Sequence, residues 1–210
     1  MSEARPRAAS PTIGAGEAPP VLARLVRGEI VEAAHRGDVA IVGPCGELRA
    51  ALGAPARLVS LRSAVKPFTA VAVLCAAEAA GIALDDAEVA LASASHAGSD
   101  EHVAVAQQMV DRHGLDPALL VHGRPSPLRA GASGELLRHM CSGQHLSLLL
   151  LAKAMGVEGR GYDRFEHPVQ RRLREVVGAL LGTNLDAAPW GMDGCAIPTA
   201  AVPLAVAAEG

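Results

Sequence analysis

Aromatic side chains are almost absent from this chain of 210 residues, which contains two Phe, one Tyr and one Trp. The bases of single-stranded nucleic acid stack on aromatic side chains, and so few of them cannot form such a surface. The net charge of −3 gives no general attraction to a phosphate backbone. Long apolar runs are lacking too, because the strongest, Leu146 to Ala152, is far shorter than the roughly 18 residues that cross a membrane. We therefore expect neither nucleic acid nor a membrane as a partner.

The sequence also lacks a secretory signal and a disulfide framework. Residues 1–19 are rich in Ala, Pro, Gly and Ser without the continuous apolar core of a signal peptide, so we expect a disordered tail there. The four cysteines show no close spacing of the kind that indicates paired disulfides. Half of the residues are apolar and a fifth are charged, which is typical of a globular domain. We expect a cytoplasmic protein with one domain over residues 20–210.

Hydrophobic patterns predict a mixed α+β fold. Alternating apolar residues between positions 21 and 41 predict short antiparallel strands. Apolar residues at helical spacing predict helices, and the glycines that follow three of them are expected to end them. The expected helices cover residues 63–80, 99–113, 146–155 and 168–180. We also expect the apolar run 200–208 to begin a helix, and Cys75 to lie in the core.

Ser63 and Lys66 lie three residues apart at the start of the apolar run 67–80. Residues at this spacing share one face of a helix, so their side chains can meet. A serine hydroxyl becomes an effective nucleophile when a base takes its proton, and a lysine amine can serve as that base when burial lowers its pKa. The same spacing arises by chance in roughly one chain in ten of this composition. A catalytic pair, or a helix cap beside a solvated lysine, would each account for these two residues.

Three short stretches of small and reactive residues provide further candidate sites. Small residues dominate 94–99, which allows close approach of a ligand to backbone and hydroxyl groups such as that of Ser95. The stretch 141–143 precedes an apolar helix, where backbone amides can bind an anion and the pKa of a thiol is lowered. Asp193 and Cys195 place an acid and a thiol one residue apart. Taken singly, Ser95 and His96 are accounted for by an ordinary polar loop.

Together, five motifs occur in an order that resembles the asparaginase II family. They are Arg-Ser-x-x-Lys-Pro-Phe, Ser-His-x-Gly, Cys-Ser-Gly-x-His, His-Pro-Val-Gln and Asp-Gly-Cys-x-Ile-Pro-Thr, beginning at Arg62, Ser95, Cys141, His167 and Asp193. The resemblance extends from about residue 20 to residue 210. It implies a fold similar to serine β-lactamases and penicillin-binding proteins, with an antiparallel sheet and flanking helices. It also implies a homodimer that hydrolyses L-asparagine to L-aspartate and ammonia.

The resemblance implies roles for individual residues. Ser63 corresponds to the nucleophile, Lys66 to its base, and Ser95 to a second catalytic serine. The residues that correspond to substrate-binding positions are Arg62, His145 and Asp193. In this assignment Arg62 binds the α-carboxylate of the substrate and Asp193 its α-ammonium group.

A zinc ion is also implied, with Cys141 and Cys195 as ligands. Gln144 stands where the family has a lysine that joins the two thiolates at the metal. An amide oxygen is a weaker zinc ligand than an amine or a thiolate, so we expect weakened zinc binding.

The C-terminal end departs from the resemblance. Family chains continue past the position of Gly210, and the lysine that pairs with the second serine lies in that continuation, whereas no lysine follows Lys153 here. We therefore expect a fold that is incomplete at the C-terminus. Two hypotheses follow: an amidohydrolase, or an inactive or truncated family member that binds an amino acid or a partner chain without turnover. A cell-wall transpeptidase or β-lactamase is disfavoured, because neither Ser-Asp-Asn nor Lys-Thr-Gly occurs.

Overall fold

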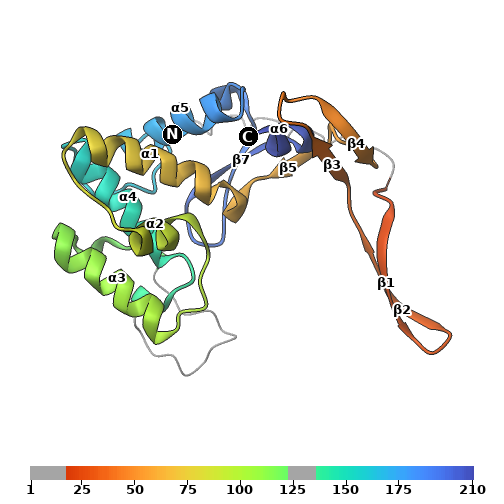
Figure 1. The fold of residues 1–210 in the computed structure, drawn as a ribbon, viewed down its shortest axis with the longest axis horizontal. Helices are drawn as coiled ribbons and strands as arrows, with labels where there is room; N and C mark the ends of the chain where they lie inside the picture. The colour runs from red at the N-terminus through yellow and green to blue at the C-terminus, as the bar shows by residue number, and fades with distance from the viewer. Residues whose placement is uncertain (1–17, 123–135) are drawn as a thin grey trace, which may run out of the picture.

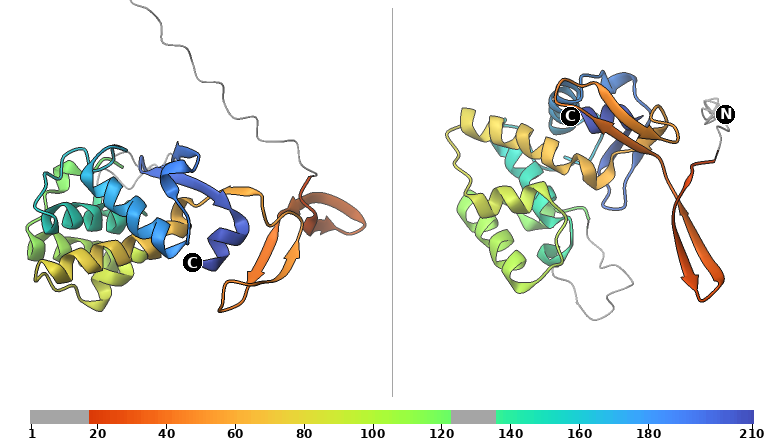
Figure 2. Two further views of the ribbon diagram at one scale, coloured as in Figure 1. Left: turned by 90° about the horizontal axis from the view of Figure 1, so that it is seen from above. Right: turned by 45° about the vertical axis from the view of Figure 1, so that its right-hand side comes forward.

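The computed structural model describes residues 18–122 and 136–210. The disordered tail expected over residues 1–19 therefore lies almost entirely outside the described residues. Helices and antiparallel strands occur together, which confirms the expected mixed α+β class. Figure 1 shows the longer helices gathered at one end of the molecule and two β-hairpins extending from the other. The two views in Figure 2 show the same separation.

Two β-hairpins come first in the described chain. Strand β1 (Val21–Arg27) pairs antiparallel with β2 (Ile30–Arg36), and Gly28 takes a φ of 58° in the turn between them. Strand β3 (Val39–Val42) pairs antiparallel with β4 (Leu48–Leu52). Each pair forms a two-stranded sheet of its own.

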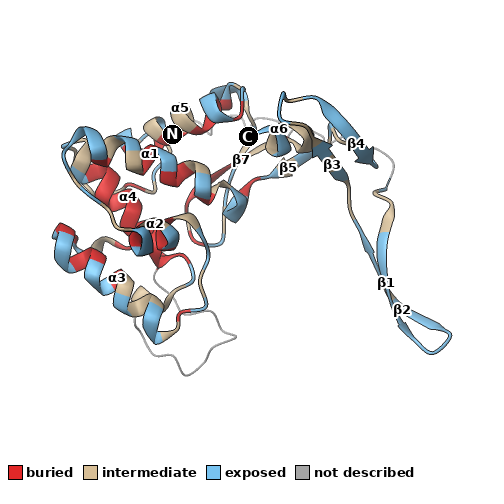
Figure 3. Ribbon diagram, viewed as in Figure 1, coloured by how far each residue is buried: buried red, intermediate tan, exposed pale blue. Residues whose placement is uncertain are grey.

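The first hairpin buries almost none of its apolar side chains. Figure 3 shows it exposed along nearly its whole length, in contrast to the buried faces of the helices. Four of its large apolar side chains are each more than half exposed: Leu25, Val26, Ile30 and Val31. A hairpin with a solvated apolar surface is marginally stable by itself, so these side chains are available for burial against another surface.

A three-stranded sheet with the order β5-β7-β6 supports the site. Its central strand β7 (Pro198–Pro203) pairs antiparallel with β5 (Leu58–Ser60) and with β6 (Trp190–Met192). Helix α6 (Leu204–Glu209) follows β7 directly. The prediction of a helix from residue 200 was therefore wrong for its first four residues. Proline at 203 cannot continue a helix, and the preceding backbone bonds to β5 and β6 instead.

Five longer helices build the other end of the fold. They are α1 (Lys66–Ala79), α2 (Asp86–Ser93), α3 (Asp100–His113), α4 (Ser142–Ala154) and α5 (Pro168–Leu180). Short 3₁₀ turns connect them or precede them: η1 (Arg62–Val65), η2 (Pro117–Leu119), η4 (Leu136–Arg138) and η5 (Leu185–Ala187). No helix within residues 18–122 and 136–210 is both long and apolar enough to span a bilayer.

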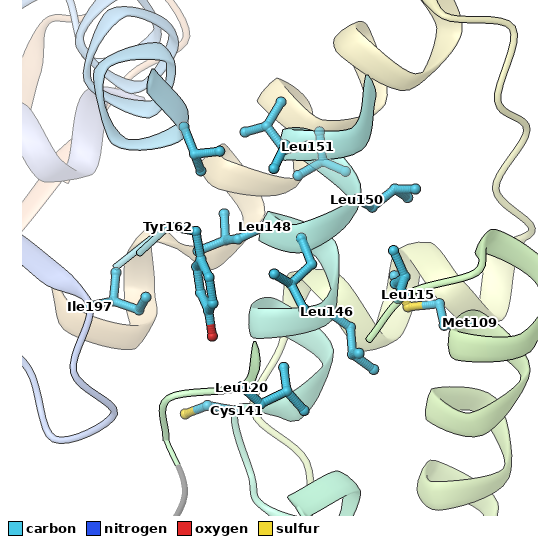
Figure 4. Packing of buried hydrophobic residues seen from close by; sticks show 14 of the residues in the cluster. Met109, Leu115, Leu120, Cys141, Leu146, Leu148, Leu150, Leu151, Tyr162 and Ile197 are labelled. Atoms are coloured by element: carbon cyan, nitrogen blue, oxygen red, sulfur yellow. The ribbon is translucent and has the colours of Figure 1, made fainter. Parts of the chain in front are cut away.

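Helix α4 is the centre of the core. It packs against all four of the other long helices, and eleven of its thirteen residues are buried. Figure 4 shows its leucines meeting side chains from α3 and from the segment that carries Tyr162. Each fully buried leucine stabilises the fold by about 2 kcal/mol. A rigid helix with a buried N-terminus is therefore available to position Cys141, which precedes it.

Capping residues set the helix boundaries largely where the sequence indicates them. Asp85 forms a capping box with Glu88 at the start of α2. His167 accepts a hydrogen bond from the Val169 amide, and Pro168 occupies the first turn of α5. Gly114, with a φ of 59°, ends α3 as expected.

Two local predictions were wrong. The helix expected from residue 63 is divided, because residues 62–65 form the 3₁₀ turn η1 and α1 begins only at Lys66. Arg62 has a φ of 42°, a conformation that favours glycine and separates β5 from the helical segment. Cys75 is exposed instead of buried in the core. The apolar residues of α1 extend beyond the face of the helix that packs against the core, and Cys75 lies outside that face.

Candidate active site

Lys66 is the residue that joins the elements of the site. It is the first residue of α1 and only 1% exposed. Its Nζ lies 2.9 Å from Ser95 Oγ, 3.4 Å from the Ala94 carbonyl oxygen and 3.4 Å from Cys141 Sγ. The side-chain nitrogen therefore has three hydrogen-bond partners, which offset the cost of burying it.

Ser63 lies on the surface of η1. Its carbonyl oxygen accepts a hydrogen bond from the Lys66 amide, but no hydrogen bond joins its hydroxyl to Lys66 among the described residues. The two residues share a helical turn as the spacing predicts, while the lysine side chain is directed to Ser95. The site therefore contains a hydrogen-bonded Lys66–Ser95 pair and an exposed serine one turn before the lysine.

The loop after α2 places Ser95 by a set of hydrogen bonds to the segment before α4. The His96 amide donates to the Met140 carbonyl oxygen. The His96 Nδ1 atom accepts from the Gly98 amide, so its Nε2 carries the proton and donates to Ser142 Oγ at 2.9 Å. Burial lowers the pKa of His96 to about 4, and the nearby His102 and Lys66 act in the same direction. A neutral imidazole therefore holds the loop at neutral pH.

Cys141 and Cys195 lie together at the base of the site. Both are buried. The Cys195 thiol is the largest influence that lowers the pKa of Cys141, and His139 and Lys66 act in the same direction. The Cys141 thiol and burial both raise the pKa of Cys195. Cys141 is therefore the more readily ionised of the two thiols.

The turn between β6 and β7 brings Asp193 and Cys195 into the site. One carboxylate oxygen of Asp193 accepts hydrogen bonds from the Cys195 and Ile197 amides, at 2.8 and 3.2 Å. Ala196 has a φ of 69°, so the turn is strained at a residue other than glycine. These bonds fix the orientation of the carboxylate.

Arg62 approaches the same turn from η1. A side-chain carbon added at Gly194 would lie 3.7 Å from Arg62 Nη2. The Arg62 amide donates to Thr199 Oγ1 at 2.9 Å, which holds its strained backbone against β7. A guanidinium and a carboxylate, the two groups that bind an amino acid by its charged ends, thus lie on adjoining segments.

His145 is completely buried one turn into α4. Its Nδ1 lies 2.5 Å from the Tyr162 hydroxyl, which also accepts a hydrogen bond from the Val121 amide. Burial lowers the pKa of His145 to about 2, and the neighbouring His122 and His139 act in the same direction. Tyr162 therefore donates to a neutral imidazole. Figure 4 shows its hydroxyl directed toward the end of the core where Cys141 lies.

The donor set for zinc consists of the two thiols alone. Among residues 18–122 and 136–210, no group of three His, Cys, Asp or Glu side chains is arranged to hold a metal ion. Gln144, which replaces the expected lysine ligand, is buried with its Oε1 unpartnered, and it lines a cavity between α1, α5 and β7. Protein zinc sites have three or four protein ligands, so the groups present do not complete one.

The comparison with known families is consistent with this arrangement. The family model for L-asparaginase II matches residues 23–210. The match covers most of the chain, and the chain belongs to the L-asparaginase II family. A search of curated proteins found no match. Family membership indicates an asparaginase-type hydrolase with an amino-acid substrate.

Two residues of the site were not singled out from the sequence. Thr199 Oγ1 accepts from the Arg62 amide and lies 3.3 Å from Ser60 Oγ, so it fastens η1 to the sheet. Its position at the end of the Asp-Gly-Cys-x-Ile-Pro-Thr motif is a signal that could have identified it. Tyr162 carried no such signal, because its contact with His145 depends on tertiary packing.

Proposed function

We propose that the chain hydrolyses the side-chain amide of L-asparagine to L-aspartate and ammonia. The observation that carries this proposal is the buried Lys66 amine, hydrogen-bonded to Ser95 and one helical turn from Ser63. Amide hydrolysis needs a nucleophile for the carbonyl carbon and a proton for the departing ammonia. A serine beside a lysine amine can supply both.

In the proposed mechanism Ser63 attacks the amide carbonyl and forms a covalent aspartyl ester. Lys66 acts as the base, and the Ser95 hydroxyl passes the proton between Ser63 and the amine. The same route returns the proton to the leaving ammonia, and water then hydrolyses the ester with Lys66 as base again. Backbone amides beside Ser63 are proposed to stabilise the oxyanion.

Substrate recognition is proposed for Arg62 and Asp193. The guanidinium would bind the α-carboxylate of asparagine and the carboxylate its α-ammonium group. The proximity of Arg62 to Gly194 supports this pairing, because it leaves the two charged groups on adjoining segments. His145, assigned to the substrate by the resemblance, is completely buried against Tyr162, and we propose that it supports the Cys141 end of α4.

Ser95 has a lysine partner within this chain. The family resemblance places that partner beyond residue 210, whereas here Lys66 Nζ donates to Ser95 Oγ. This geometry favours turnover over the alternative, a family member that binds without catalysis. Ammonia release from L-asparagine, compared with L-glutamine and D-asparagine, is the direct test.

A homodimer is also proposed, as the resemblance implies. The apolar side chains exposed on β1 and β2 support it, since such surfaces are commonly covered in assemblies. Sedimentation velocity should show a species of twice the chain mass, and Ile30→Asp should shift it toward the monomer. A monomer at all concentrations would contradict this part of the proposal. Zinc binding stays a prediction, and no step of the mechanism depends on it.

A further inference from the structure

The backbone of Arg62 adopts a conformation that needs support. Its φ of 42° lies in the left-handed region, which is costly for a residue with a side chain and persists only where neighbouring groups hold it. Arg62 begins the turn η1 just after β5, whose pairing with β7 stops at Ser60. The groups that hold this backbone therefore also set the direction in which the guanidinium leaves the chain.

The hydroxyl of Thr199 is the group that meets the Arg62 backbone. Thr199 is on β7, the central strand of the sheet, and is 9% exposed. Its Oγ1 accepts a hydrogen bond from the Arg62 amide at 2.9 Å and lies 3.3 Å from Ser60 Oγ. The preceding amide, that of Leu61, still donates to a backbone carbonyl oxygen, that of Ala200. A side-chain hydroxyl thus replaces the backbone acceptor where the chain turns away from the sheet.

The sheet itself is held by other hydrogen bonds. All three residues of β5 pair with β7 through the backbone, and Thr199 pairs with Gly191 of β6 in the same way. Removal of the hydroxyl would leave this pairing in place and take the acceptor from the Arg62 amide. The strained backbone of Arg62 would then be free to relax.

Thr199 is also close in sequence to the other charged group of the site. Strand β7 follows the turn that carries Asp193, so the strand that holds Arg62 also bears this carboxylate at its entrance. A side-chain carbon added at Gly194, in the same turn, would lie 3.7 Å from Arg62 Nη2. The spacing between guanidinium and carboxylate therefore depends on the hydrogen bond between Arg62 and Thr199.

We propose that Thr199 is a positioning residue for recognition of the α-carboxylate of the amino-acid substrate, and that it acts through the backbone of Arg62. The inference rests on the proposed function, in which Arg62 binds that carboxylate. The hydroxyl of Thr199 holds Arg62 in its left-handed conformation, and this conformation directs the guanidinium. Serine at position 199 should therefore replace threonine, whereas valine, which has nearly the same size but no hydroxyl, should not.

Steady-state hydrolysis of L-asparagine tests the requirement for the hydroxyl. In Thr199→Val the KM should rise about tenfold and kcat should change less than about threefold, because a binding contact is lost. Thr199→Ser should keep the KM of the unchanged chain. Ser60→Ala removes the neighbouring hydroxyl but leaves the acceptor of the Arg62 amide, so its KM should also be kept. A lower kcat with an unchanged KM in Thr199→Val, or equal KM values in Thr199→Val and Thr199→Ser, would overturn the proposal.

A double-mutant cycle tests whether Thr199 acts through Arg62. Arg62→Ala by itself should raise the KM for L-asparagine. Thr199→Val added to Arg62→Ala should raise it less than about twofold further, because the guanidinium that Thr199 positions is already gone. Full additivity of the two changes would show that Thr199 acts by another route.

Hydrogen exchange at the Arg62 amide tests the proposal without turnover. Exchange should be faster in Thr199→Val than in Thr199→Ser or the unchanged chain, each shown by circular dichroism to be folded. If Thr199→Val does not fold, Thr199→Ala removes the same hydroxyl and takes its place in every measurement. Equal exchange rates would overturn the proposal. Faster exchange in Thr199→Val, with no ammonia release from the unchanged chain, would support the hold on Arg62 and contradict the proposed function alone.

Discussion

Lys66 Nζ lies 2.9 Å from Ser95 Oγ, although 29 positions separate the two residues in the sequence. This hydrogen bond links the start of α1 to the loop after α2. The same amine lies 3.4 Å from Cys141 Sγ, so three segments of the chain meet at one buried nitrogen. The function of the protein depends on whether this amine acts as a base.

The covalent intermediate distinguishes the two serines. In Ser63→Ala, acid quenching during turnover of L-asparagine should yield no aspartyl adduct by intact mass spectrometry. In Ser95→Ala the adduct should still form, at a rate lowered about 10²-fold or more because proton transfer is impaired. Ser93→Ala, which changes a hydroxyl that bonds only to the Val89 carbonyl oxygen on α2, is the matched control. An adduct that maps to Ser95 would reverse the two roles.

Restoring a lysine at position 144 should create a stronger zinc site. Gln144→Lys puts an amine where the resemblance implies the third zinc ligand, and we expect zinc affinity to rise at least about tenfold, or ~1.4 kcal/mol. Competition with a chromophoric chelator measures the change. The same substitution made together with Cys141→Ser should lose most of the gain. Equal affinity in Gln144→Lys and the unchanged chain would show that the added amine does not reach the thiols.

Acid should destabilise the fold through His145. Its pKa is about 2 in the folded protein and about 6.5 when unfolded, so the unfolded state binds more protons below pH 6.5. The contribution of His145 to the free energy of unfolding is fully present above pH 6.5 and is lost as the pH falls toward 2. Once the histidine of the unfolded state is protonated, the loss is about 1.4 kcal/mol per pH unit.

Urea unfolding between pH 6 and 4 tests this dependence. His145→Gln lacks the titrating ring, so its free energy of unfolding should fall by about 1 kcal/mol less per pH unit than that of the unchanged chain. His35→Gln removes an exposed histidine of β2 and should leave the slope unchanged. Equal slopes for the unchanged chain and His145→Gln would show that the imidazole is solvated in both states.

The parts of the fold that sequence predicted well are those set by local signals. Helix α3 begins after Ser99 and ends at Gly114 because acidic residues and a glycine mark its two ends. The strand over 198–203 was missed because pairing with Leu58–Ser60, far away in the chain, overrides the local apolar pattern. Short apolar runs carry no information about such distant partners.

The site was predictable to a similar extent. Spacing alone identified Ser63 and Lys66 as neighbours on a helix, but the direction of the lysine side chain depends on Ser95 and Cys141, which other segments supply. The resemblance implied that Cys141 and Cys195 are neighbours, and the influence of each thiol on the pKa of the other agrees with it, but their separation in the sequence could not indicate it. Motif order thus indicated which segments converge, while packing decided which atoms meet.

The most direct measurement is ammonia release from L-asparagine by the unchanged chain and by Lys66→Met. The account predicts release by the unchanged chain and a loss of about 10³-fold or more in Lys66→Met, because the base is gone. Lys153→Met, which changes the other lysine of the chain, should retain activity. Unchanged turnover in Lys66→Met, or no release from a chain shown to be folded, would contradict the account.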